Sequence, residues 1–277
     1  MNAAHPITDR PLEGRRIAIL EHREQDRLGG MLEAQGALTL RCPLVRIADA
    51  PDPAPVLAWL RRFLDVPPDD LVLMTGEGLR RLRGFAGRAG LAPEFLGALG
   101  QVRTITRGPK PAQALREIGL VPGLRAERPT SEGVVAALAG GVLRGRRVAV
   151  QLYPGASPVV ADFLGNAGAF PDPVWPYVYL PAAGGEEIRR LIEETAAGRI
   201  DVVAFTSSPQ VGQLFRMAQG ANAEGQLRGA LERTRIAAVG PVVAAELERH
   251  GLSVAIMPAE SFFMKPLVSA IAAALSG

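Results

Sequence analysis

Residues Thr234–Leu252 read TRIAAVGPVVAAELERHGL, and residues Val102–Leu120 read VRTITRGPKPAQALREIGL. When the two stretches are aligned so that Arg103 matches Arg235, an offset of 132, seven of eighteen positions are identical. Each stretch places a short aliphatic or β-branched run before a Gly-Pro turn and a helical pattern. This recurrence of strand, turn and helix indicates that one structural unit occurs twice in the chain.

Two further matches keep almost the same offset. LEGRRIAI at Leu12–Ile19 recurs as LRGRRVAV at Leu143–Val150, 131 residues later. Asp70 of DDLVLMTG recurs as Asp201 of DVVAFTSS, again 131 residues later. Because three matched stretches follow in the same order at nearly one spacing, the sequence predicts a chain duplicated from a half of about 131 residues.

Each half alternates short apolar runs with helical patterns. Strands are expected at Arg16–Leu20, Leu38–Arg41, Leu71–Met74, Val102–Ile105 and Leu124–Ala126 in the first half, and at Arg147–Leu152, Val174–Tyr179, Val202–Phe205, Ile236–Val239 and Val254–Met257 in the second. Nearly continuous apolar strands that alternate with helices are typical of parallel sheets covered by helices on both faces. The predicted fold is therefore α/β, with two doubly wound parallel-sheet domains.

Local signals mark several helix ends. Gly119 and Gly251 each close a helical pattern, at the position where a left-handed backbone favours glycine. Ser131 is expected to cap the helix that follows it, since a serine oxygen can accept a hydrogen bond from the first turn. Pro266 fits the first turn of the last helix.

Composition restricts the class of protein. The chain has 277 residues, of which 48% are hydrophobic and 21% charged, as in an ordinary globular protein of one or two domains. Its apolar runs are shorter than the roughly 18 residues that cross a bilayer, and the N-terminal MNAAHPITDRPLEGRR has no apolar core of a secretory signal. We expect a cytoplasmic protein with no membrane contact. Aromatic residues are only 5% of the chain, so no nucleic-acid partner is expected.

The sequence offers little for a metal site. Cys42 is the single cysteine and lies in the strand-like stretch LTLRCPLV, while His5, His22 and His250 are scattered without a ligand partner one helical turn away. We expect no metal and no cofactor. Nearly all basic side chains are arginines, whose planar fork suits carboxylates, so some of them could line a cleft for an acidic ligand.

The candidate site lies in the turns that follow the strands. In open parallel sheets ligands bind at the carboxyl ends of the strands, and N–H groups at helix N-termini there can hold anions. The turns TGEG, RGPK, SSPQ and GPVV follow four expected strands. The sequence has no dinucleotide or P-loop glycine motif and no nucleophile elbow after a strand. Any chemistry is expected to depend on positioning and backbone hydrogen bonds.

The stretches AVGPVVAAELERHGL, DVVAFTSSPQV, RRIAILEHREQDRLGGMLEAQG and YVYLP together resemble the uroporphyrinogen-III synthase family, over essentially the whole chain. The resemblance implies a discontinuous domain 1, residues 1–44 with 180–277, and a domain 2, residues 46–175. Two antiparallel linker strands, near 42–47 and 174–180, would join them. It also implies a hinged, basic cleft and a monomer.

The family converts the linear tetrapyrrole hydroxymethylbilane into uroporphyrinogen III, with inversion of ring D and loss of water, and uses neither metal nor coenzyme. The resemblance implies the same substrate here, and a transient contact with the enzyme that supplies it. Tyr177 matches the family's tyrosine, which ends a linker strand and assists departure of the substrate hydroxyl. The substrate-binding residues implied by the turns and the resemblance are Arg23, Thr75, Gly76, Arg107, Gly108, Lys110, Thr206, Ser207, Ser208, Gly240 and Pro241.

The sequence departs from the family pattern at several positions, among them the end of the first strand, which usually reads T-R and here reads LEHR, so that Arg23 is a displaced candidate for the arginine. Pro111 and Val243 stand where the family usually has threonine, and Glu77 lies in a turn where an acidic substrate would be repelled. Two alternatives stay open, and these departures favour the first of them. One is a non-catalytic or regulatory protein that binds a tetrapyrrole or another polycarboxylate. The other is a two-lobed small-ligand binder of periplasmic type, in which the N-terminal strand would pair within the first half of the chain.

Overall fold

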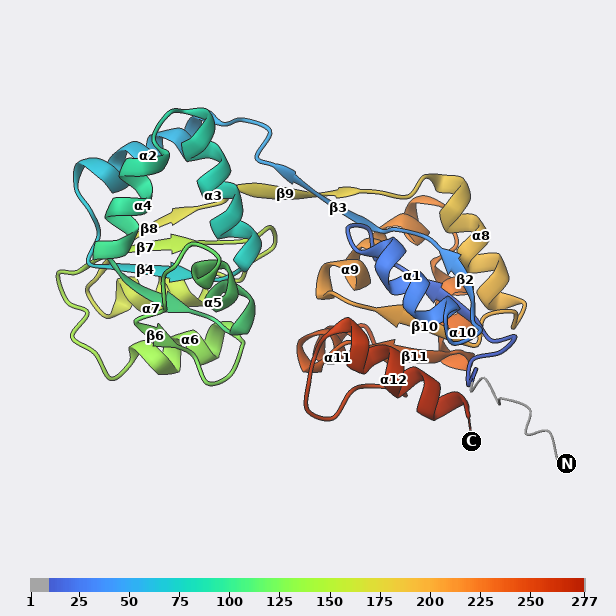
Figure 1. Cartoon of the computed structure of the whole chain (residues 1–277). Helices are drawn as coiled ribbons and strands as arrows, with labels where there is room; N and C mark the ends of the chain where they lie inside the picture. Colours follow the sequence, from blue (N-terminus) through green and yellow to red (C-terminus); the bar gives the residue numbers. More distant parts are fainter. Residues whose placement is uncertain (1–9, 277) are drawn as a thin grey trace, which may run out of the picture. The chain divides into compact units, whose positions relative to one another are not determined.

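The computed structural model describes residues 10–276, which form two compact units (Figure 1). Unit 1 combines the residues up to Arg46 with the residues from Leu180 onward, and unit 2 contains Ile47–Tyr179. His5 lies outside the described residues. No helix within residues 10–276 is long and apolar enough to cross a bilayer.

Unit 1 is built around a four-stranded sheet in the order β11-β10-β1-β2. Its elements are β1 (Arg16–Ile19), α1 (Gln25–Glu33), β2 (Leu38–Arg41), α8 (Gly185–Ala196), β10 (Val202–Phe205), α9 (Ser208–Gly220), α10 (Glu224–Arg233), β11 (Arg235–Ala238), α11 (Pro241–Arg249) and α12 (Met264–Leu275). All neighbouring strands are parallel, and Ile17 of β1 lies beside Val202 of β10. The N-terminal strand thus pairs with the C-terminal part of the chain, unlike the pairing expected of the periplasmic-type binder.

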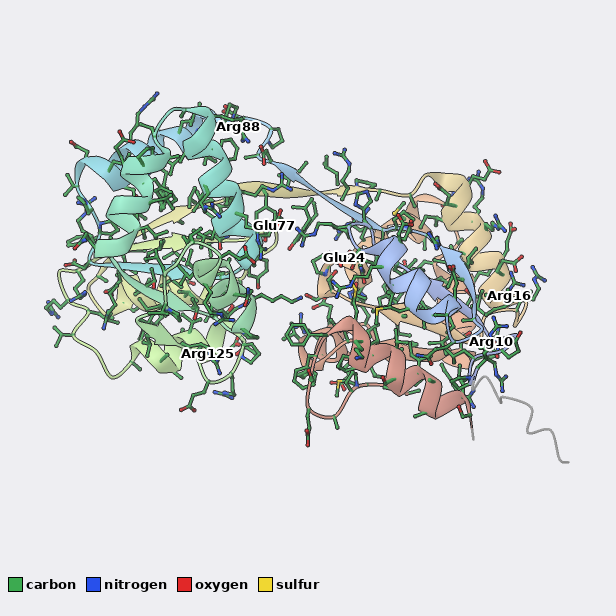
Figure 2. The ribbon with its side chains drawn as sticks, in the orientation of Figure 1. Arg10, Arg16, Glu24, Glu77, Arg88 and Arg125 are labelled. Atoms are coloured by element: carbon green, nitrogen blue, oxygen red, sulfur yellow. The ribbon has the colours of Figure 1, made fainter. Side chains whose placement is uncertain are left out.

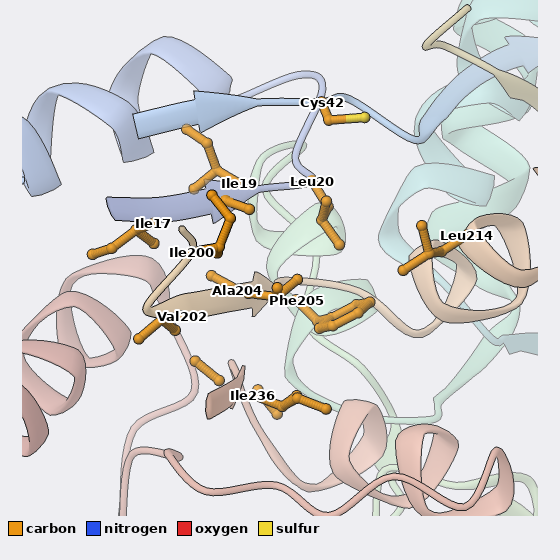
Figure 3. Packing of buried hydrophobic residues seen from close by; sticks show 14 of the residues in the cluster. Ile17, Ile19, Leu20, Cys42, Ile200, Val202, Ala204, Phe205, Leu214 and Ile236 are labelled. Atoms are coloured by element: carbon orange, nitrogen blue, oxygen red, sulfur yellow. The ribbon is translucent and has the colours of Figure 1, made fainter. Parts of the chain in front are cut away.

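The central strands β1 and β10 of the unit 1 sheet are buried on both faces, which explains why they read as continuous apolar runs. Ile17, Ile19, Val202 and Phe205 are fully buried, and Figure 3 shows them with Ile236 in one cluster. Burying a side chain of this size contributes about 1.5–3 kcal/mol to folding. Segments from both ends of the sequence therefore share one core.

Unit 2 has a five-stranded parallel sheet in the order β6-β5-β4-β7-β8. Its elements are α2 (Ala54–Asp65), β4 (Asp70–Leu73), α3 (Gly76–Arg88), α4 (Ala92–Gln101), β5 (Arg103–Thr106), α5 (Pro109–Arg116), β6 (Leu124–Arg125), α6 (Ser131–Leu138), β7 (Arg147–Gln151), α7 (Val159–Asn166) and β8 (Phe170–Val174). Two apolar clusters cover its two faces. The predicted α/β fold with two parallel sheets is confirmed.

The two sheets are copies of each other. The order β5-β4-β7-β8 of unit 2 corresponds strand for strand to β11-β10-β1-β2 of unit 1. Three of these four pairs, β5 with β11, β4 with β10 and β7 with β1, are those that the sequence repeat links. In unit 1 the counterparts of β7 and β8 come first in the chain. This order makes unit 1 discontinuous in sequence.

The prediction of one strand at Val174–Tyr179 is wrong. The structure has two strands in this region: β8 ends at Val174, and β9 (Tyr177–Pro181) begins at Tyr177. β8 contains Pro171 and Pro173, which a strand tolerates only where no ladder N–H is needed. It pairs with β7 along one side only, where Phe170 N donates to Arg146 O, and its other side is the edge of the sheet. Because Pro171 and Pro173 alternate with Phe170, their missing N–H groups fall on the open edge.

β9 pairs with β3 (Val45–Asp49) in a separate two-stranded sheet. Ala50 N donates to Pro176 O, and Ala182 N donates to Leu44 O. Residue numbers rise along one strand as they fall along the other, so the two strands are antiparallel. Both strands overlap the linker segments expected near 42–47 and 174–180.

Two smaller expectations also change. The strand expected at Val254–Met257 is reduced to a single bridge between Ile256 and Ala237. Ser131 is the first residue of α6 rather than its cap, because Thr130 Oγ1 accepts the hydrogen bond from Gly133 N at 3.0 Å.

The two glycine predictions hold. Gly119 and Gly251 have φ values of 76° and 77°, the left-handed conformation expected of them. Both follow the end of a helix at equivalent positions of the repeat, so each half of the chain ends this helix in the same way.

Candidate functional site

Parallel pairing brings the predicted turns of each unit to the carboxyl edge of its sheet. In unit 2, Thr75 follows β4, Arg107 follows β5, and Tyr153 follows β7. In unit 1, Glu21 follows β1 and Thr206 follows β10. The two edges are described separately below.

All three tyrosines of the sequence gather in unit 2. Tyr177 is 2% exposed, and its hydroxyl lies 3.1 Å from Thr75 Oγ1. The rings of Tyr177 and Tyr179 meet edge to face with centroids 5.6 Å apart. Arg107 places its guanidinium carbon 4.9 Å from the centroid of the Tyr153 ring, as a cation–π contact. Tyr177 begins strand β9, whereas its family match implied the end of a linker strand.

The buried phenols are held in their neutral form. Burial raises the pKa of Tyr177, and the hydrogen bonds with Thr75 and Tyr179 and the charge of Arg107 offset only part of this rise. Burial, together with the neighbouring Tyr177, also raises the pKa of Tyr179. A phenol whose pKa lies above about 10 keeps its proton at physiological pH. Both groups can therefore donate a proton or a hydrogen bond, but neither is suited to act as a base.

Thr75 is fixed by three hydrogen bonds besides its contact with Tyr177. Its Oγ1 accepts from Gly78 N at 3.0 Å and caps α3, while its own N and Oγ1 donate to Gln151 Oε1 at 3.0 and 3.3 Å. A Cβ at Gly78 would lie 1.9 Å from Gln151 Cδ, and a Cβ at Gly76 would lie 2.6 Å from Lys110 O. Only glycine leaves room for these neighbours. Gly76 is thus required by packing, as well as being a predicted binding residue.

The Gly-Pro turns of the two units are built alike. Gly108 and Gly240 have an extended backbone and precede α5 and α11. A Cβ at Gly108 would lie 2.8 Å from Pro129, and one at Gly240 would lie 2.8 Å from Phe262. Glycine is needed here because another segment passes closely over the backbone, so that these two positions are constrained by packing.

The donors of Thr206 and the backbone N of Ser207 are occupied by Gln210 and Glu21. Gln210 Oε1 accepts from the backbone N of Thr206 at 2.8 Å and of Ser207 at 3.2 Å. The Thr206 hydroxyl donates to a carboxylate oxygen of Glu21, whose other oxygen accepts from Arg23 N at 3.0 Å. The turn is therefore a closed network in this conformation, and an anion could use these donors only by displacing Gln210 and Glu21.

Sequence reasoning missed Glu21 and Gln210, although one signal was present. Ser207 and Gln210 stand three residues apart before an apolar run, which is the spacing of a capping box. Ser208 is the first residue of α9 and Pro241 the first of α11, so both lie where predicted, at helix N-termini. No comparable signal marks Glu21, because its partner Thr206 is 185 positions away.

Glu77, Pro111 and Val243, which depart from the family pattern, are each accommodated by their surroundings in the structure. Glu77 accepts a hydrogen bond from Arg81 Nε at 2.8 Å, and Arg81 Nη1 also contacts Asp49 at 2.8 Å. The Glu77 side chain is 10% exposed, so its charge is compensated inside the unit. Pro111 and Val243 are buried on the inner faces of α5 and α11.

Figure 2 shows the side chains as sticks, with the charged residues Glu77 and Arg125 among those labelled. Four cationic residues lie on the carboxyl side of the unit 2 sheet: Arg107 and Lys110 after β5, Arg125 at the end of β6, and Arg128 just beyond it. Lys110, Arg125 and Arg128 are exposed, and Arg107 is half-buried. The exposed Glu127 and Glu132 lie on the same edge, and the four cations outnumber them, so the edge suits anionic groups.

Other features of the structure lie away from this site. A hollow of about 340 Å³ is lined by Thr234 and Gly251, among others, and a smaller one of about 130 Å³ by Val102 and Leu120. Both lie at the amino ends of β11 and β5, opposite the edge where parallel sheets bind ligands. Burial raises the pKa of Cys42 to about 12, so its thiol stays protonated and unreactive.

The sequence is similar to one protein family and to two relatives in particular. The family model for uroporphyrinogen-III synthase HemD matches residues 26–269. YjjA of Bacillus subtilis, an uncharacterized protein, is 32% identical over 254 residues, which are 89% of this chain and 91% of YjjA. A putative uroporphyrinogen-III synthase of Methanothermobacter thermautotrophicus is 32% identical over 171 residues, which are 61% of this chain and 65% of that protein.

Solved structures of uroporphyrinogen III synthases are also similar to this chain. A mutant uroporphyrinogen III synthase from the extremely thermophilic bacterium Thermus thermophilus has a TM-score of 0.77 at 29% identity, covering 94% of this chain and 98% of that one. The synthetase from Helicobacter pylori shares the fold, with a TM-score of 0.53 at 14% identity over 94% of this chain and 99% of that one. Since the family model matches well over half of the sequence, this chain belongs to the uroporphyrinogen-III synthase family.

Proposed function

We propose that the protein is a uroporphyrinogen-III synthase, which cyclises hydroxymethylbilane to uroporphyrinogen III with inversion of ring D and loss of water. One observation carries this proposal beyond family membership. At the carboxyl edge of unit 2, the buried phenol of Tyr177 is aligned by Thr75, and Arg107 lies stacked on Tyr153. Loss of a hydroxyl from an anionic substrate requires an acid that carries its proton and a cation that binds the negative charge, and this edge offers both.

The substrate hydroxyl can leave as water only if it gains a proton while its carbon–oxygen bond breaks. Tyr177 keeps its proton because burial raises the pKa of the phenol, and its hydroxyl is positioned 3.1 Å from Thr75 Oγ1. The adjacent pyrrole supplies the electron pair that the carbon loses when its bond to the hydroxyl oxygen breaks. Inversion of ring D would also require that the methylene bridge to this ring breaks and re-forms at the ring's other α-carbon, and the proton lost from the carbon that is attacked last restores the acid.

The cationic residues of unit 2 would bind the carboxylate arms of the substrate. Arg107 is held by the Tyr153 ring, so less side-chain freedom is lost when it pairs with a carboxylate. Lys110, Arg125 and Arg128 are exposed and would attract an anionic chain. Holding the two ends of a flexible substrate together contributes through proximity, which suits a reaction that closes a ring.

The decisive experiment is to incubate the purified protein with freshly made hydroxymethylbilane and to separate the product isomers by chromatography. We expect uroporphyrinogen III, detected after oxidation to the porphyrin. Without a synthase the bilane closes to the uninverted isomer I. Isomer I alone, at the rate of a protein-free control, would exclude the proposed activity.

A second candidate is a non-catalytic protein that binds a tetrapyrrole or another polycarboxylate. The observation that favours it is the closed network of unit 1, in which Gln210 and Glu21 occupy the donors of Thr206 and Ser207. It predicts saturable binding of uroporphyrinogen III, measured anaerobically by calorimetry, without turnover of the bilane.

A further inference from the structure

The hydroxyl oxygen of Thr75 has three partners inside unit 2, and together they use its full hydrogen-bonding capacity. It accepts from Gly78 N at 3.0 Å, and it lies 3.3 Å from Gln151 Oε1 and 3.1 Å from the Tyr177 hydroxyl. A threonine hydroxyl has one proton to donate and two lone pairs. A substrate oxygen could therefore bind to this hydroxyl only if one of the three partners were released.

The side-chain amide of Gln151 is oriented by backbone groups. A backbone N–H can only donate, so the atom that lies 3.0 Å from Thr75 N is the amide oxygen, and the amide nitrogen donates to Leu152 O. Gln151 is fully buried, and a Cβ at Gly78 would lie 1.9 Å from its Cδ, so the amide has little room to turn over. The atom beside the Thr75 hydroxyl is thus an acceptor, which attracts the threonine proton.

The direction of the hydrogen bond between Thr75 and Tyr177 follows from these contacts. One lone pair of the Thr75 hydroxyl accepts from Gly78 N, and its proton points to Gln151 Oε1. Only the second lone pair faces Tyr177, so the phenol donates to the threonine. The buried phenol thereby has a partner before any substrate binds.

Unit 1 gives the threonine of the corresponding turn the opposite polarity. Leu20 follows β1 at the position that Gln151 has in β7, and the glutamine comes from α9 as Gln210. Gln210 Nε2 donates to the Thr206 hydroxyl at 2.9 Å, and this hydroxyl donates to Glu21. An amide that donates leaves the threonine proton for a carboxylate, whereas an amide that accepts leaves a lone pair for a phenol. The turn itself therefore does not require a glutamine on the strand.

We propose that Thr75 and Gln151 form a hydrogen-bond pair that serves Tyr177 during proton transfer, so that Thr75 is a positioning residue rather than a substrate contact. The inference rests on the proposed synthase function and adds a residue pair to it. When Tyr177 passes its proton to the departing hydroxyl, Thr75 turns its own proton from Gln151 Oε1 to the phenolate oxygen. This proton stays bonded to Thr75, and only its hydrogen bond changes partner. The phenolate is stabilised until it regains a proton from the substrate.

Other groups around the phenol act in both directions. Burial and the charge of Glu77 raise the pKa of Tyr177, whereas the hydrogen bonds with Thr75 and Tyr179 and the charge of Arg107 lower it. Because burial opposes the phenolate, a donor that turns to this oxygen during the reaction has a larger effect than it would have in water.

The test is a double-mutant cycle on kcat for the formation of uroporphyrinogen III. Thr75→Val removes the hydroxyl and should lower kcat about 10- to 100-fold, as for a lost hydrogen bond to a charged group, while KM changes less than about twofold. In a Tyr177→Phe background the same substitution should lower kcat less than about twofold further, because no phenolate forms there. Thr75→Ser keeps the hydroxyl and should recover most of the kcat that Thr75→Val loses.

Thr75 also caps α3, so the loss of a cap needs its own control. Thr130 caps α6 of the same unit and accepts from Gly133 N at the same distance of 3.0 Å. Thr75→Val and Thr130→Val should each lower Tm by about 2–5 °C, but only Thr75→Val should lower kcat. An equal loss of kcat in both variants would overturn the proposal, as would an equal effect of Thr75→Val with and without the phenol of Tyr177.

The direction of the hydrogen bond can be measured without turnover. The intensity ratio of the tyrosine doublet in Raman spectra differs between a phenol that donates and one that accepts, and the difference between each protein and its Tyr177→Phe counterpart isolates this residue. We expect a donor in the wild type. Gln151→Leu should move the signal toward an acceptor, because Thr75 then turns its proton to the phenol. If Gln151→Leu does not fold, adding Gly78→Gln supplies an acceptor for Thr75 N from the helix itself.

Failure of the synthase proposal and failure of this inference are distinguishable. If the wild type forms no uroporphyrinogen III, the synthase proposal fails, and the Raman comparison then decides alone whether Thr75 and Gln151 orient the proton of Tyr177. A donor that becomes an acceptor in Gln151→Leu would support the hydrogen-bond pair. An acceptor in the wild type, or an unchanged signal in Gln151→Leu, would exclude it.

Discussion

Arg146 Nε lies 2.8 Å from Asp70 Oδ2 at the amino end of the unit 2 sheet, and Asp70 is completely buried. Arg103 Nε donates to the other oxygen of the same carboxylate. Unit 1 contains the matching pair, in which Arg15 Nη1 lies 3.2 Å from Asp201 Oδ1. Both partners are displaced by 131 positions, so the ion pair was duplicated with the backbone.

The two ion pairs differ in burial, and this difference predicts their stability effects. Asp70→Asn leaves two arginines without their buried carboxylate and should lower the free energy of unfolding of unit 2 by about 2–4 kcal/mol, less than for a fully buried pair because the arginines are partly exposed. Asp201 is 29% exposed as a side chain, so Asp201→Asn should cost below about 1 kcal/mol. Urea unfolding monitored by circular dichroism measures both. Equal losses would contradict the ranking.

Tyr177→Phe separates catalysis from binding. The phenyl ring still fills the buried site, so the variant should fold, but the O–H beside Thr75 is lost. If Tyr177 supplies the proton, kcat should fall by about 10² or more, whereas the affinity for uroporphyrinogen III should change little. Trp175→Phe, which alters an exposed aromatic residue nearby in the chain, is the control and should keep full activity. A Tyr177→Phe enzyme with wild-type kcat would remove this residue from the mechanism.

Arg107→Lys tests whether the guanidinium stacked on Tyr153 binds a carboxylate. Lysine keeps the charge but loses the planar fork and the stacking, so we expect KM to rise about tenfold, and to rise further as salt is added. Arg116→Lys is the matched control, because Arg116 is exposed in the last turn of α5 and donates to Gln113 of the same helix. A KM shift common to both variants would point to a general effect of replacing arginine rather than to a site at Arg107.

The sheets could be predicted from the sequence because their signals are local or repeated. Continuous apolar runs such as Val202–Phe205 can be recognised within a few residues, and the offset of 131 links the two copies. The left-handed Gly119 and Gly251 follow from the same kind of local signal. β8 was missed because two prolines normally argue against a strand, and only its edge position makes them tolerable.

The chemistry of the candidate site depends on partners that are distant in sequence. Gln151 accepts from Thr75 N across 76 positions, and Gln210 does the same for Thr206 in the other unit from within its own helix. These two glutamines are not related by the repeat, although they satisfy equivalent turns. The capping-box spacing indicates the contact of Gln210, but no periodicity or spacing indicates the contact of Gln151, which is set by packing between elements.

The acid stability of unit 1 gives a test of how its discontinuous segments are joined. Glu194 of α8 lies 2.8 Å from Arg199 Nη2 and 3.0 Å from Arg16 Nη2 of β1. The hydrogen bond from Arg199, with the charges of both arginines, lowers the pKa of Glu194 to about 2. A carboxyl whose pKa is depressed on folding stabilises the native state above its unfolded pKa, near 4.5, and this contribution is lost as the pH falls toward 2.

Glu194→Gln should therefore flatten the decline of unfolding free energy between pH 4.5 and about 2, while it lowers stability slightly at pH 7. Glu193→Gln, at the adjacent position of the same helix, removes an equal charge without removing the bonded carboxylate, and should leave the slope as in the wild type. Urea unfolding repeated at several pH values measures the slopes. Parallel curves for wild type and Glu194→Gln would mean that this carboxylate does not hold the N-terminal strand to the C-terminal segment in solution, and that the shared apolar core alone does so.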